Sequence, residues 1–226
     1  VYNRSFDIED LPIFLHLLKS FEDHDIVPVI YEPLYLQLKL QYHFQKKFEL
    51  FSETYPLSTK TKFVFSMGGD GTMLDIVKFV ADKKIPILGI NLGRLGFLSA
   101  THVDDIDFAI NSLLKDSYML DPRSLIHLDS NVNLFSDAPF ALNEFSLHRK
   151  DSSSLIKIHT YLNGEFLCTY WADGLMVSTP TGSTGYSLSC GGPIIFPQAS
   201  SFLITPVAPH NLNVRPIVVA DNSIIT

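Results

Sequence analysis

Cysteine is scarce in this sequence, and the two that occur, Cys168 and Cys190, belong to no Cys-x-x-Cys pair. A chain of this kind has no disulfide framework and suits a reducing compartment. The 8 histidines are dispersed, without the His-x-x-x-His or Glu-x-x-His spacing of metal sites. We therefore expect no structural zinc, and the sequence predicts no residue as a metal ligand.

Long apolar runs are also missing, since none approaches the roughly 18 residues that a membrane span requires. Positive charge is thin: 17 Lys and Arg stand against 24 Asp and Glu, for a net charge of −7, and they are scattered. We expect neither a membrane nor a nucleic-acid partner. An anionic ligand would have to be held by backbone amides, a metal and a few local cations.

The first half of the chain alternates strand-like and helix-like segments. Helices are predicted at residues 11–21, 34–50, 72–80 and 104–114, and strands at residues 27–31, 63–66 and 85–91. The strand at 85–91 is too continuously apolar to have one wet face. This alternation is typical of a parallel sheet covered on both sides. We assign residues 1–121 to an α/β domain.

The second half changes to strands alone. Residues 125–128, 141–148, 155–163, 165–172, 202–207 and 217–220 are β-like. Asn163-Gly164 is a strong signal for a type I′ hairpin. The predicted fold class is therefore α/β, with an N-terminal parallel sheet domain followed by a mostly antiparallel β domain at residues 122–226.

Gly68-Gly-Asp-Gly71 joins a predicted strand to a predicted helix. Three glycines let backbone N–H groups at the helix N-terminus approach an anion, and the helix dipole favours phosphate. Asp70 would repel phosphate, so we interpret it as a chemical group that accepts a proton from a hydroxyl or helps to hold a metal. The alternative is a plain turn with Asp70 as helix N-cap. These residues alone leave both open.

The glycine turn does not fit two better-known patterns. Leu74 stands where a dinucleotide fingerprint has its third glycine, and the Gly-Lys-Ser/Thr of a P-loop is missing. A second glycine loop, Asn91-Leu-Gly-Arg-Leu-Gly-Phe97, follows the next strand. Ligands of open α/β sheets bind beyond the carboxyl ends of the strands, so we expect the two loops to face one cleft. Arg94 could contact a phosphate there or simply be exposed.

Two segments of the second half are unusual for plain β structure. Asn143-Glu144 is a polar pair in an apolar strand, and residues 178–185 are nearly all hydroxyl-bearing, Gly or Pro. Such a stretch can bind sugars or phosphates, although it is often an ordinary loop. Serine hydrolysis is poorly supported, because Ser189 stands where a nucleophile elbow around Ser187 requires glycine.

Several motifs occur together in one order across residues 60–220: Gly68-Gly-Asp-Gly-Thr72, Asn91-Leu-Gly-x-Leu-Gly-Phe97, Asn143-Glu144, Asp173-Gly174 with Ser178-Thr-Pro-Thr-Gly-Ser-Thr-Gly-Tyr186, and Pro209-His210. In this combination the chain resembles the ATP-NAD kinase family, and within it the mitochondrial NADH kinases of fungi. The first motif is shared with diacylglycerol, sphingosine and phosphofructokinase relatives. Thr-Pro-Thr-Gly-Ser-Thr with Asn-Glu is far more specific.

The resemblance implies phosphoryl transfer from ATP, with Mg²⁺, to the 2′-hydroxyl of the adenosine ribose of NAD⁺ or NADH. It makes Asp70 the proton acceptor and places Gly71 against the dinucleotide. Asn143 and Glu144 would bind ribose or adenine groups, and Asp173 would contact the nicotinamide side. The predicted nucleotide-binding residues are Gly68, Gly69, Gly71, Thr72, Arg94, Phe97, Asn143, Glu144, Asp173, Thr181, Thr184, Gly185, Tyr186 and Ser189.

Two positions depart from the family pattern. Gly185 stands where many members have alanine, and Trp171 where some have a basic residue near the nicotinamide. Either difference bears on the choice between the oxidised and the reduced ring. Two other functions stay open: a lipid kinase, which the hydroxyl-rich run argues against, and a non-catalytic NAD(H)-binding module.

The resemblance also implies a homo-oligomer whose subunits meet at the β domain, and a place in the mitochondrial matrix, with the cytoplasm as alternative. The sequence begins at Val1 without methionine or a basic presequence, so we expect any targeting segment to be absent from it. Family members continue beyond the position of Thr226. Part of the β domain, or its return to the first domain, is therefore expected to be missing.

Overall fold

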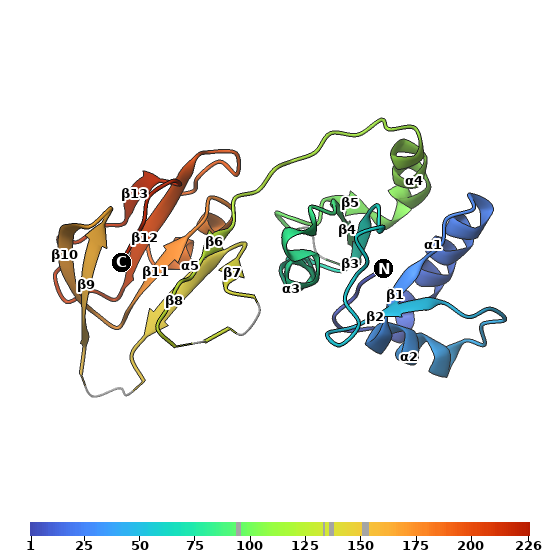
Figure 1. Cartoon of the computed structure of the whole chain (residues 1–226), viewed down its shortest axis with the longest axis horizontal. Coiled ribbons are helices and arrows are strands. Elements are labelled where there is room, and N and C mark those ends of the chain that lie inside the picture. The colour runs from blue at the N-terminus through green and yellow to red at the C-terminus, as the bar shows by residue number, and fades with distance from the viewer. Residues whose placement is uncertain (94–95, 133, 136–137, 151–153) are drawn as a thin grey trace. The chain divides into compact units, whose positions relative to one another are not determined.

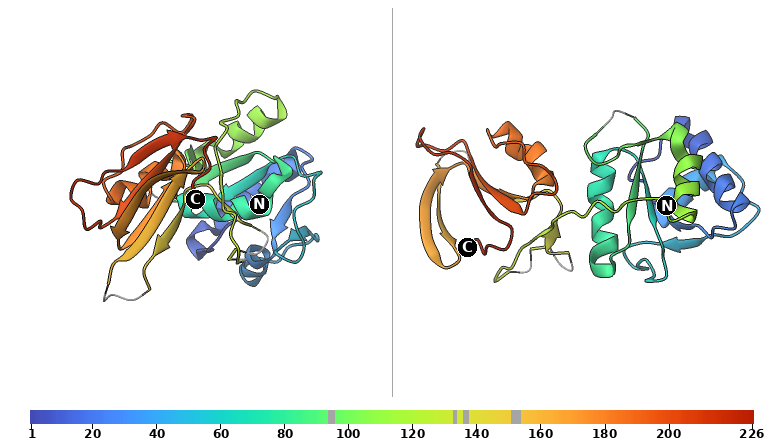
Figure 2. Two further views of the ribbon diagram at one scale, coloured as in Figure 1. Left: turned by 60° about the vertical axis from the view of Figure 1, so that its left-hand side comes forward. Right: turned by 90° about the horizontal axis from the view of Figure 1, so that it is seen from above.

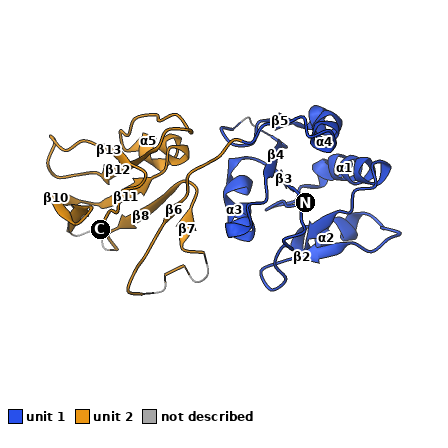
Figure 3. Cartoon of the chain, turned by 45° about the horizontal axis from the view of Figure 1, so that its top comes forward, with its two compact units in different colours: residues 1–120 blue, residues 121–226 orange. Residues whose placement is uncertain are grey.

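The computed structural model divides the chain into two compact units, Val1–Leu120 and Asp121–Thr226 (Figures 1 and 3). It describes residues 1–93, 96–132, 134–135, 138–150 and 154–226. Within these ranges no helix is both long enough and apolar enough to cross a membrane.

The first unit contains a parallel sheet and flanking helices. Its helices are α1 (Leu11–Asp23), α2 (Glu32–Gln41), α3 (Asp70–Val80) and α4 (Ile106–Leu114), and its strands are β1 (Val29–Tyr31), β2 (Glu49–Phe51), β3 (Val64–Met67), β4 (Ile87–Asn91) and β5 (Thr101–His102). Strands β3, β4 and β5 pair in parallel in that order, and β1 pairs in parallel with β2.

The first residues of the chain join these two sheets. The Tyr2 N–H donates to the Phe65 carbonyl, and the Tyr2 carbonyl accepts from the Met67 N–H, both at 2.8 Å. On the other side the Val1 carbonyl accepts from the Tyr31 N–H at 2.9 Å. The sequence analysis assigned nothing to this segment. It behaves as a strand inserted between β1 and β3.

The buried strands send alternate side chains to two apolar clusters. Phe65 and Met67 pack with residues of α1, α2 and α4, whereas Val64 packs with residues of α3. In the right-hand view of Figure 2, α3 lies on one side of these strands, and α1 and α4 lie on the other. A parallel sheet covered on both faces was predicted, and this prediction is confirmed.

The helix predicted for residues 34–50 is wrong in its second half. Helix α2 ends at Gln41, where Tyr42 turns to an extended conformation, and Glu49–Phe51 pairs with β1. The rings of Phe44 and Phe48, beyond the end of α2, meet edge to face with centroids 5.3 Å apart and pack against Tyr35.

The second unit is mostly antiparallel. Its strands are β6 (Ile126–His127), β7 (Phe140–Ala141), β8 (Glu144–His148), β9 (Ile156–Leu162), β10 (Glu165–Ala172), β11 (Gly174–Ser178), β12 (Ser201–Val207) and β13 (Ile217–Ala220), and its helix is α5 (Tyr186–Ser189). The largest sheet has the order β13-β12-β11-β8. Strands β9 and β10 form a hairpin, and β6 pairs with β7. The fold class predicted from the sequence is confirmed.

The β9–β10 hairpin turns at the predicted Asn163-Gly164, whose φ angles are 53° and 86°. Two consecutive positive φ angles are what a type I′ turn requires. Tyr170 of β10 then packs with Leu175 of β11 and Ile204 of β12, so the hairpin shares a small core with the sheet.

Gly164→Ala should destabilise the second unit by about 1 kcal/mol, because a Cβ strains a backbone with φ of +86° although nothing lies within 4 Å of it. Urea unfolding measures the change. Glu165→Ala at the adjacent exposed position is the control and should shift stability by less than about 0.5 kcal/mol. Equal midpoints for both variants would contradict the turn assignment.

Candidate functional site

The glycine turn follows β3 at its carboxyl end. Gly68 has a φ of 144°, and a Cβ there would lie 2.4 Å from Oγ1 of Thr72. The Gly68 N–H donates to the Ile90 carbonyl at 2.8 Å, which links the turn to β4. Position 68 therefore requires glycine, both for its backbone and for its close approach to α3.

Asp70 is the first residue of α3, and Gly69 occupies the N-cap position. The N-cap alternative for Asp70 is thus wrong. Its carboxylate reaches the second glycine loop: Oδ2 accepts from the Phe97 N–H at 2.7 Å, and Oδ1 accepts from the Leu98 and Ser99 N–H groups at 2.9 and 3.1 Å. The Ser99 hydroxyl returns the contact by donating to the Gly68 carbonyl at 2.8 Å.

These contacts orient the Asp70 carboxylate. A carboxylate has about four acceptor positions, and three are taken by backbone N–H groups. Gly96 closes over it, since a Cβ at Gly96 would lie 2.1 Å from Oδ1 of Asp70. The side chain is half-buried, so a fixed carboxylate with acceptor capacity to spare lies at the carboxyl end of β3.

The other predicted residues of the first unit have different environments. Thr72 is buried in α3, whereas the Phe97 side chain is 74% exposed. Gly69 and Gly71 have open space where a Cβ would be, apart from Arg4 near Gly71. Arg94 lies outside the described residues.

Asn3 and Arg4, which were not predicted as site residues, also lie at the glycine turn. Asn3 is buried, and its Nδ2 donates to the Met67 carbonyl at 2.7 Å, directly before the glycine turn. Nε of Arg4 pairs with Oδ2 of Asp75 at 3.2 Å, and its Nη1 would lie 3.7 Å from a Cβ at Gly71.

In the second unit, Asn143 and the hydroxyl-rich run meet. Glu144 of β8 is paired with Ser178 of β11, and the Thr179 N–H donates to the Asn143 carbonyl at 2.8 Å. Gly182 packs directly on this carbonyl, since a Cβ there would lie 2.2 Å from it. The close approach explains why glycine stands at 182.

The hydroxyls of the run mainly hold its own fold. The Gly182 N–H donates to Oγ1 of Thr179 at 3.1 Å, and Oγ of Ser183 donates to the Pro180 carbonyl at 2.6 Å. Thr184 donates from Oγ1 to the Thr181 carbonyl at 3.3 Å. Thr179, Thr181 and Ser183 are buried. The run is therefore a tight turn of fixed shape, with a 3-10 segment at Thr181–Thr184, rather than a row of free hydroxyls.

Three buried side-chain oxygens at this turn have no partner among the described residues: Oγ of Ser178, Oδ1 of Asn143 and Oε2 of Glu144. The side chains of Asn143 and Glu144 converge on Gly185, where a Cβ would lie 3.4 Å from Nδ2 of Asn143 and 3.5 Å from Oε2 of Glu144. An unpaired buried acceptor costs about 1–3 kcal/mol. A ligand that offers hydroxyl or amine donors would recover that free energy.

Asp173 and Tyr186 belong to an adjoining group. Oδ2 of Asp173 pairs with Nη2 of Arg149 at 3.1 Å, a partner that the sequence analysis missed. The His148 ring stacks on Tyr186 with centroids 5.8 Å apart. Gly174 lies against the same histidine, since a Cβ there would lie 2.9 Å from Nδ1 of His148. Ser189 is exposed at the end of α5.

Arg123 is a further residue that the sequence analysis did not single out. Its Nη1 donates to Oγ1 of Thr181 at 3.3 Å, and its Nε donates to Oδ2 of Asp121 at 2.9 Å. Gln198 donates to the other oxygen of Asp121 at 2.8 Å. This chain of contacts fixes the position of Thr181.

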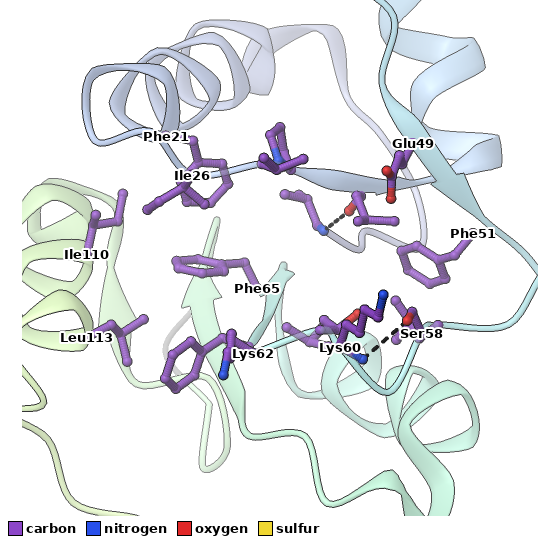
Figure 4. Close-up of a pocket in the computed structure, with 18 of the residues that line it drawn as sticks. Phe21, Ile26, Glu49, Phe51, Ser58, Lys60, Lys62, Phe65, Ile110 and Leu113 are labelled. Carbon is purple, nitrogen blue, oxygen red and sulfur yellow. Dashed lines mark hydrogen bonds between the residues drawn. The ribbon is translucent and has the colours of Figure 1, made fainter.

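The first unit also holds a cavity of about 500 Å³ that contains none of the predicted site residues (Figure 4). Its lining includes Phe21, Phe51, Phe65, Lys60 and Lys62. It also includes Phe63 and Val64, at the start of β3, whereas the glycine turn follows the end of that strand. We place the candidate chemistry at the glycine turn, because the oriented carboxylate is there.

Glu144→Gln tests the cost of the buried carboxylate. Burial raises the pKa of Glu144 above its ordinary value of 4.5. The folded chain then binds the proton more tightly than the unfolded chain, so stability falls as pH rises from 4.5 through the raised pKa. The variant should be more stable than the wild type near neutral pH, and this gain should vanish below pH 4.5.

Urea unfolding at a series of pH values measures this difference. Glu165→Gln, at an exposed position, is the matched control and should show no such gain. A Glu144→Gln variant that is no more stable than the wild type at any pH would show that burial of this carboxylate carries no cost.

Comparison with known proteins extends over nearly the whole chain. Residues 43–118 match the ATP-NAD kinase N-terminal domain, and residues 142–226 match the ATP-NAD kinase C-terminal domain. The NAD kinase of Cytophaga hutchinsonii is 46% identical over 98% of this chain and 76% of its own length. The NAD kinase of Flavobacterium psychrophilum is 43% identical over 99% of this chain and 76% of its own.

Two solved structures are similar as well. Yeast NADH kinase complexed with NADH has a TM-score of 0.82 and 25% identity, covering 99% of this chain and 69% of that chain. An NAD kinase from Archaeoglobus fulgidus in complex with ATP has a TM-score of 0.63 and 28% identity, covering 87% of this chain and 78% of that chain.

The mitochondrial location implied by the fungal resemblance is wrong. The similar relatives at 39–46% identity over almost the full chain are bacterial proteins, whereas the yeast enzyme is 25% identical. The resemblance in motifs was correct at the level of the family, but these motifs are shared by bacterial and fungal members alike. Their presence therefore says nothing of the compartment. By its two domain matches and its bacterial relatives, the chain belongs to the ATP-NAD kinase family.

Proposed function

We propose that this NAD kinase transfers the γ-phosphate of ATP to the 2′-hydroxyl of the adenosine ribose of NAD⁺ or NADH, with Asp70 as the proton acceptor. The observation that carries the proposal is the Asp70 carboxylate, held by three backbone N–H groups beside the N-terminus of α3. Similar relatives are named NAD kinases, which disfavours the lipid-kinase alternative.

The chemical step requires little of the protein beyond positioning the two substrates. The ribose oxygen forms its bond to the γ-phosphorus while the bond to the β-phosphate oxygen breaks and ADP leaves. A carboxylate is too weak a base to remove the hydroxyl proton first, so Asp70 orients the hydroxyl and takes its proton late. The contacts from residues 97–99 suit this role, because they hold the carboxylate still.

Asn143 and Glu144 are proposed to bind the nucleoside. Their unpaired oxygens, Oδ1 and Oε2, accept hydrogen bonds, and ribose hydroxyls and the adenine amino group supply donors. Thr181, Thr184, Gly185, Tyr186 and Ser189 shape the surface around them, and Asp173 lies in the adjoining group with Arg149.

Magnesium is proposed to enter with the triphosphate. Mg²⁺ binds through one or two carboxylates and substrate phosphates rather than in a cage made by protein alone. Among the described residues no group of three metal-binding side chains occurs, while Asp70 supplies one carboxylate in the first turn of α3. One carboxylate fits a metal held largely by phosphate, which would neutralise charge on the transferred group. The homo-oligomer implied by the family resemblance stays a prediction.

Which dinucleotide accepts the phosphoryl group is determined by supplying NAD⁺ and NADH separately. Trp171 of β10 is 49% exposed, and Nζ of Lys157 lies 4.3 Å from its ring centroid. A cation beside the proposed nicotinamide side would disfavour the positively charged oxidised ring. The assay incubates the protein with ATP, Mg²⁺ and either dinucleotide, and measures the NADP⁺ or NADPH formed. No product with either would overturn the proposed function.

Asp70→Asn should lower turnover by about 10²- to 10⁴-fold, because the amide cannot take the proton. It should also loosen residues 97–99, since the charged acceptor of their N–H groups is lost. Ser99→Ala separates the two effects: it removes the bond to the Gly68 carbonyl at the same junction but keeps the carboxylate. Turnover and urea unfolding are measured for both variants. Equal losses of turnover would reduce Asp70 to a structural role.

Gly96→Ala should lower turnover by about 10²-fold, because its Cβ would lie 2.1 Å from Oδ1 of Asp70 and must displace the carboxylate. Gly93→Ala in the same loop is the matched control, since nothing lies within 4 Å of a Cβ there. Steady-state kinetics at saturating ATP and dinucleotide compare the two. If both variants retain wild-type turnover, the position of the carboxylate is not what the reaction depends on.

A further inference from the structure

Arg4 lies beside the glycine turn, and no established role accounts for it. Its guanidinium faces two ways: Nε pairs with Oδ2 of Asp75 at 3.2 Å, and Nη1 is directed to Gly71, 3.7 Å from where a Cβ would be. Apart from Gly71's chain neighbours and the backbone of α3, no other atom of the described residues comes within 4 Å of that Cβ position. Arg4 is therefore the neighbour of the open side of the turn.

Stability does not explain the Arg4–Asp75 pair. The side chains are 64% and 35% exposed, and an exposed ion pair contributes about 0–1 kcal/mol. The residue before it behaves differently. Asn3 is 4% exposed, its Nδ2 donates to the Met67 carbonyl, and its Oδ1 has no partner among the described residues. Asn3 is therefore an anchor buried in the fold, whereas the Arg4 side chain is exposed and can contact a ligand.

The backbone at this position is held firmly. Tyr2 exchanges two hydrogen bonds of 2.8 Å with β3, and Asn3 is anchored to the last residue of that strand. Arg4 thus follows directly on the residues paired with β3, at the same edge of the sheet as the glycine turn. The backbone at Arg4 is held in place, while its long side chain extends into solvent.

Because the side chains near the turn are negatively charged, a cation is needed there to bind phosphate. Asp70 and Asp75 both belong to α3, and both repel phosphate. The chain carries a net charge of −7, so little long-range attraction compensates for this repulsion. A guanidinium offers several N–H donors in one plane and can bind phosphate oxygens through two of them at once. Nη1 already faces the space above Gly71.

We infer that Arg4 binds a phosphate chain at the glycine turn, and that Asp75 positions its guanidinium for this contact. This inference rests on the proposed function, which brings two such chains to the site: the triphosphate of ATP and the pyrophosphate of the dinucleotide. Both present the same chemistry to Arg4. Kinetics with each substrate varied in turn assign the contact to one of them.

The test compares Arg4→Gln, Arg4→Lys and Asp75→Asn with Lys78→Gln. Lys78 is the matched control. Like Arg4 it is an exposed cation in an ion pair, since its Nζ lies 2.7 Å from Oε1 of Glu53, but it stands in the last turn of α3, away from the glycine turn. Arg4→Gln should raise the KM of one substrate about 10- to 100-fold, as expected for a lost charge-assisted hydrogen bond. Arg4→Lys should recover part of the loss, and Lys78→Gln should change nothing.

Two further readouts separate binding from folding. The affected KM of the wild type should rise with salt, and Arg4→Gln should flatten this dependence, because it removes a charge–charge contact. The thermal midpoint should move by only a few degrees, since an exposed pair contributes little. An Arg4→Gln enzyme with unchanged KM values and an unchanged salt dependence would overturn the inference.

Binding of inorganic tripolyphosphate, measured by calorimetry, keeps the inference independent of turnover. If the wild type forms no NADP⁺ or NADPH, the proposed function fails. Weaker tripolyphosphate binding by Arg4→Gln than by Lys78→Gln would still support the phosphate contact. Equal binding by the two variants would overturn it, whether or not the wild type is active.

Discussion

The first unit depends on one carboxylate that is bound by backbone. The Asp70 carboxylate accepts hydrogen bonds from the backbone N–H groups of residues 97–99. These bonds connect the turn after β3 to the loop after β4. Gly68 and Gly96 are glycines for the same reason, since a Cβ at either would strike Thr72 or Asp70. The residue proposed to do chemistry is therefore also the one that fixes the local fold.

The second unit differs in how its polar groups are paired. Several hydroxyls of its hydroxyl-rich run bond within the turn, as Oγ of Ser183 does to the Pro180 carbonyl, whereas Oγ of Ser178 has no partner among the described residues. Oδ1 of Asn143 and Oε2 of Glu144 are likewise left buried without partners there, at a cost in folding free energy. A rigid turn surrounds two unpaired acceptors. In the proposed function, the hydroxyl and amino groups of a nucleoside would supply the missing donors.

Sequence revealed the elements whose signals are local. Strand β3, helix α3 and strand β4 follow from apolar patterning, and the Asn163-Gly164 hairpin follows from turn chemistry. The helix expected to reach residue 50 ends at Gln41 instead, because Glu49–Phe51 pairs with β1, a contact that local patterning does not show. The partners of Asp70 could not be predicted, because backbone N–H groups 27 to 29 residues away leave no mark in side-chain type.

Arg4 could not be identified from the sequence for a related reason, and this reason bears on its role. Residues 1–3 gain strand structure only by pairing with β1 and β3, which lie far along the chain, so no short window of sequence identifies them. That same pairing carries Arg4 to the edge where the glycine turn begins. A cation on a loop of its own would have to be ordered at each binding event. A cation at the end of a buried strand has its backbone already fixed, so binding a phosphate chain orders only its side chain.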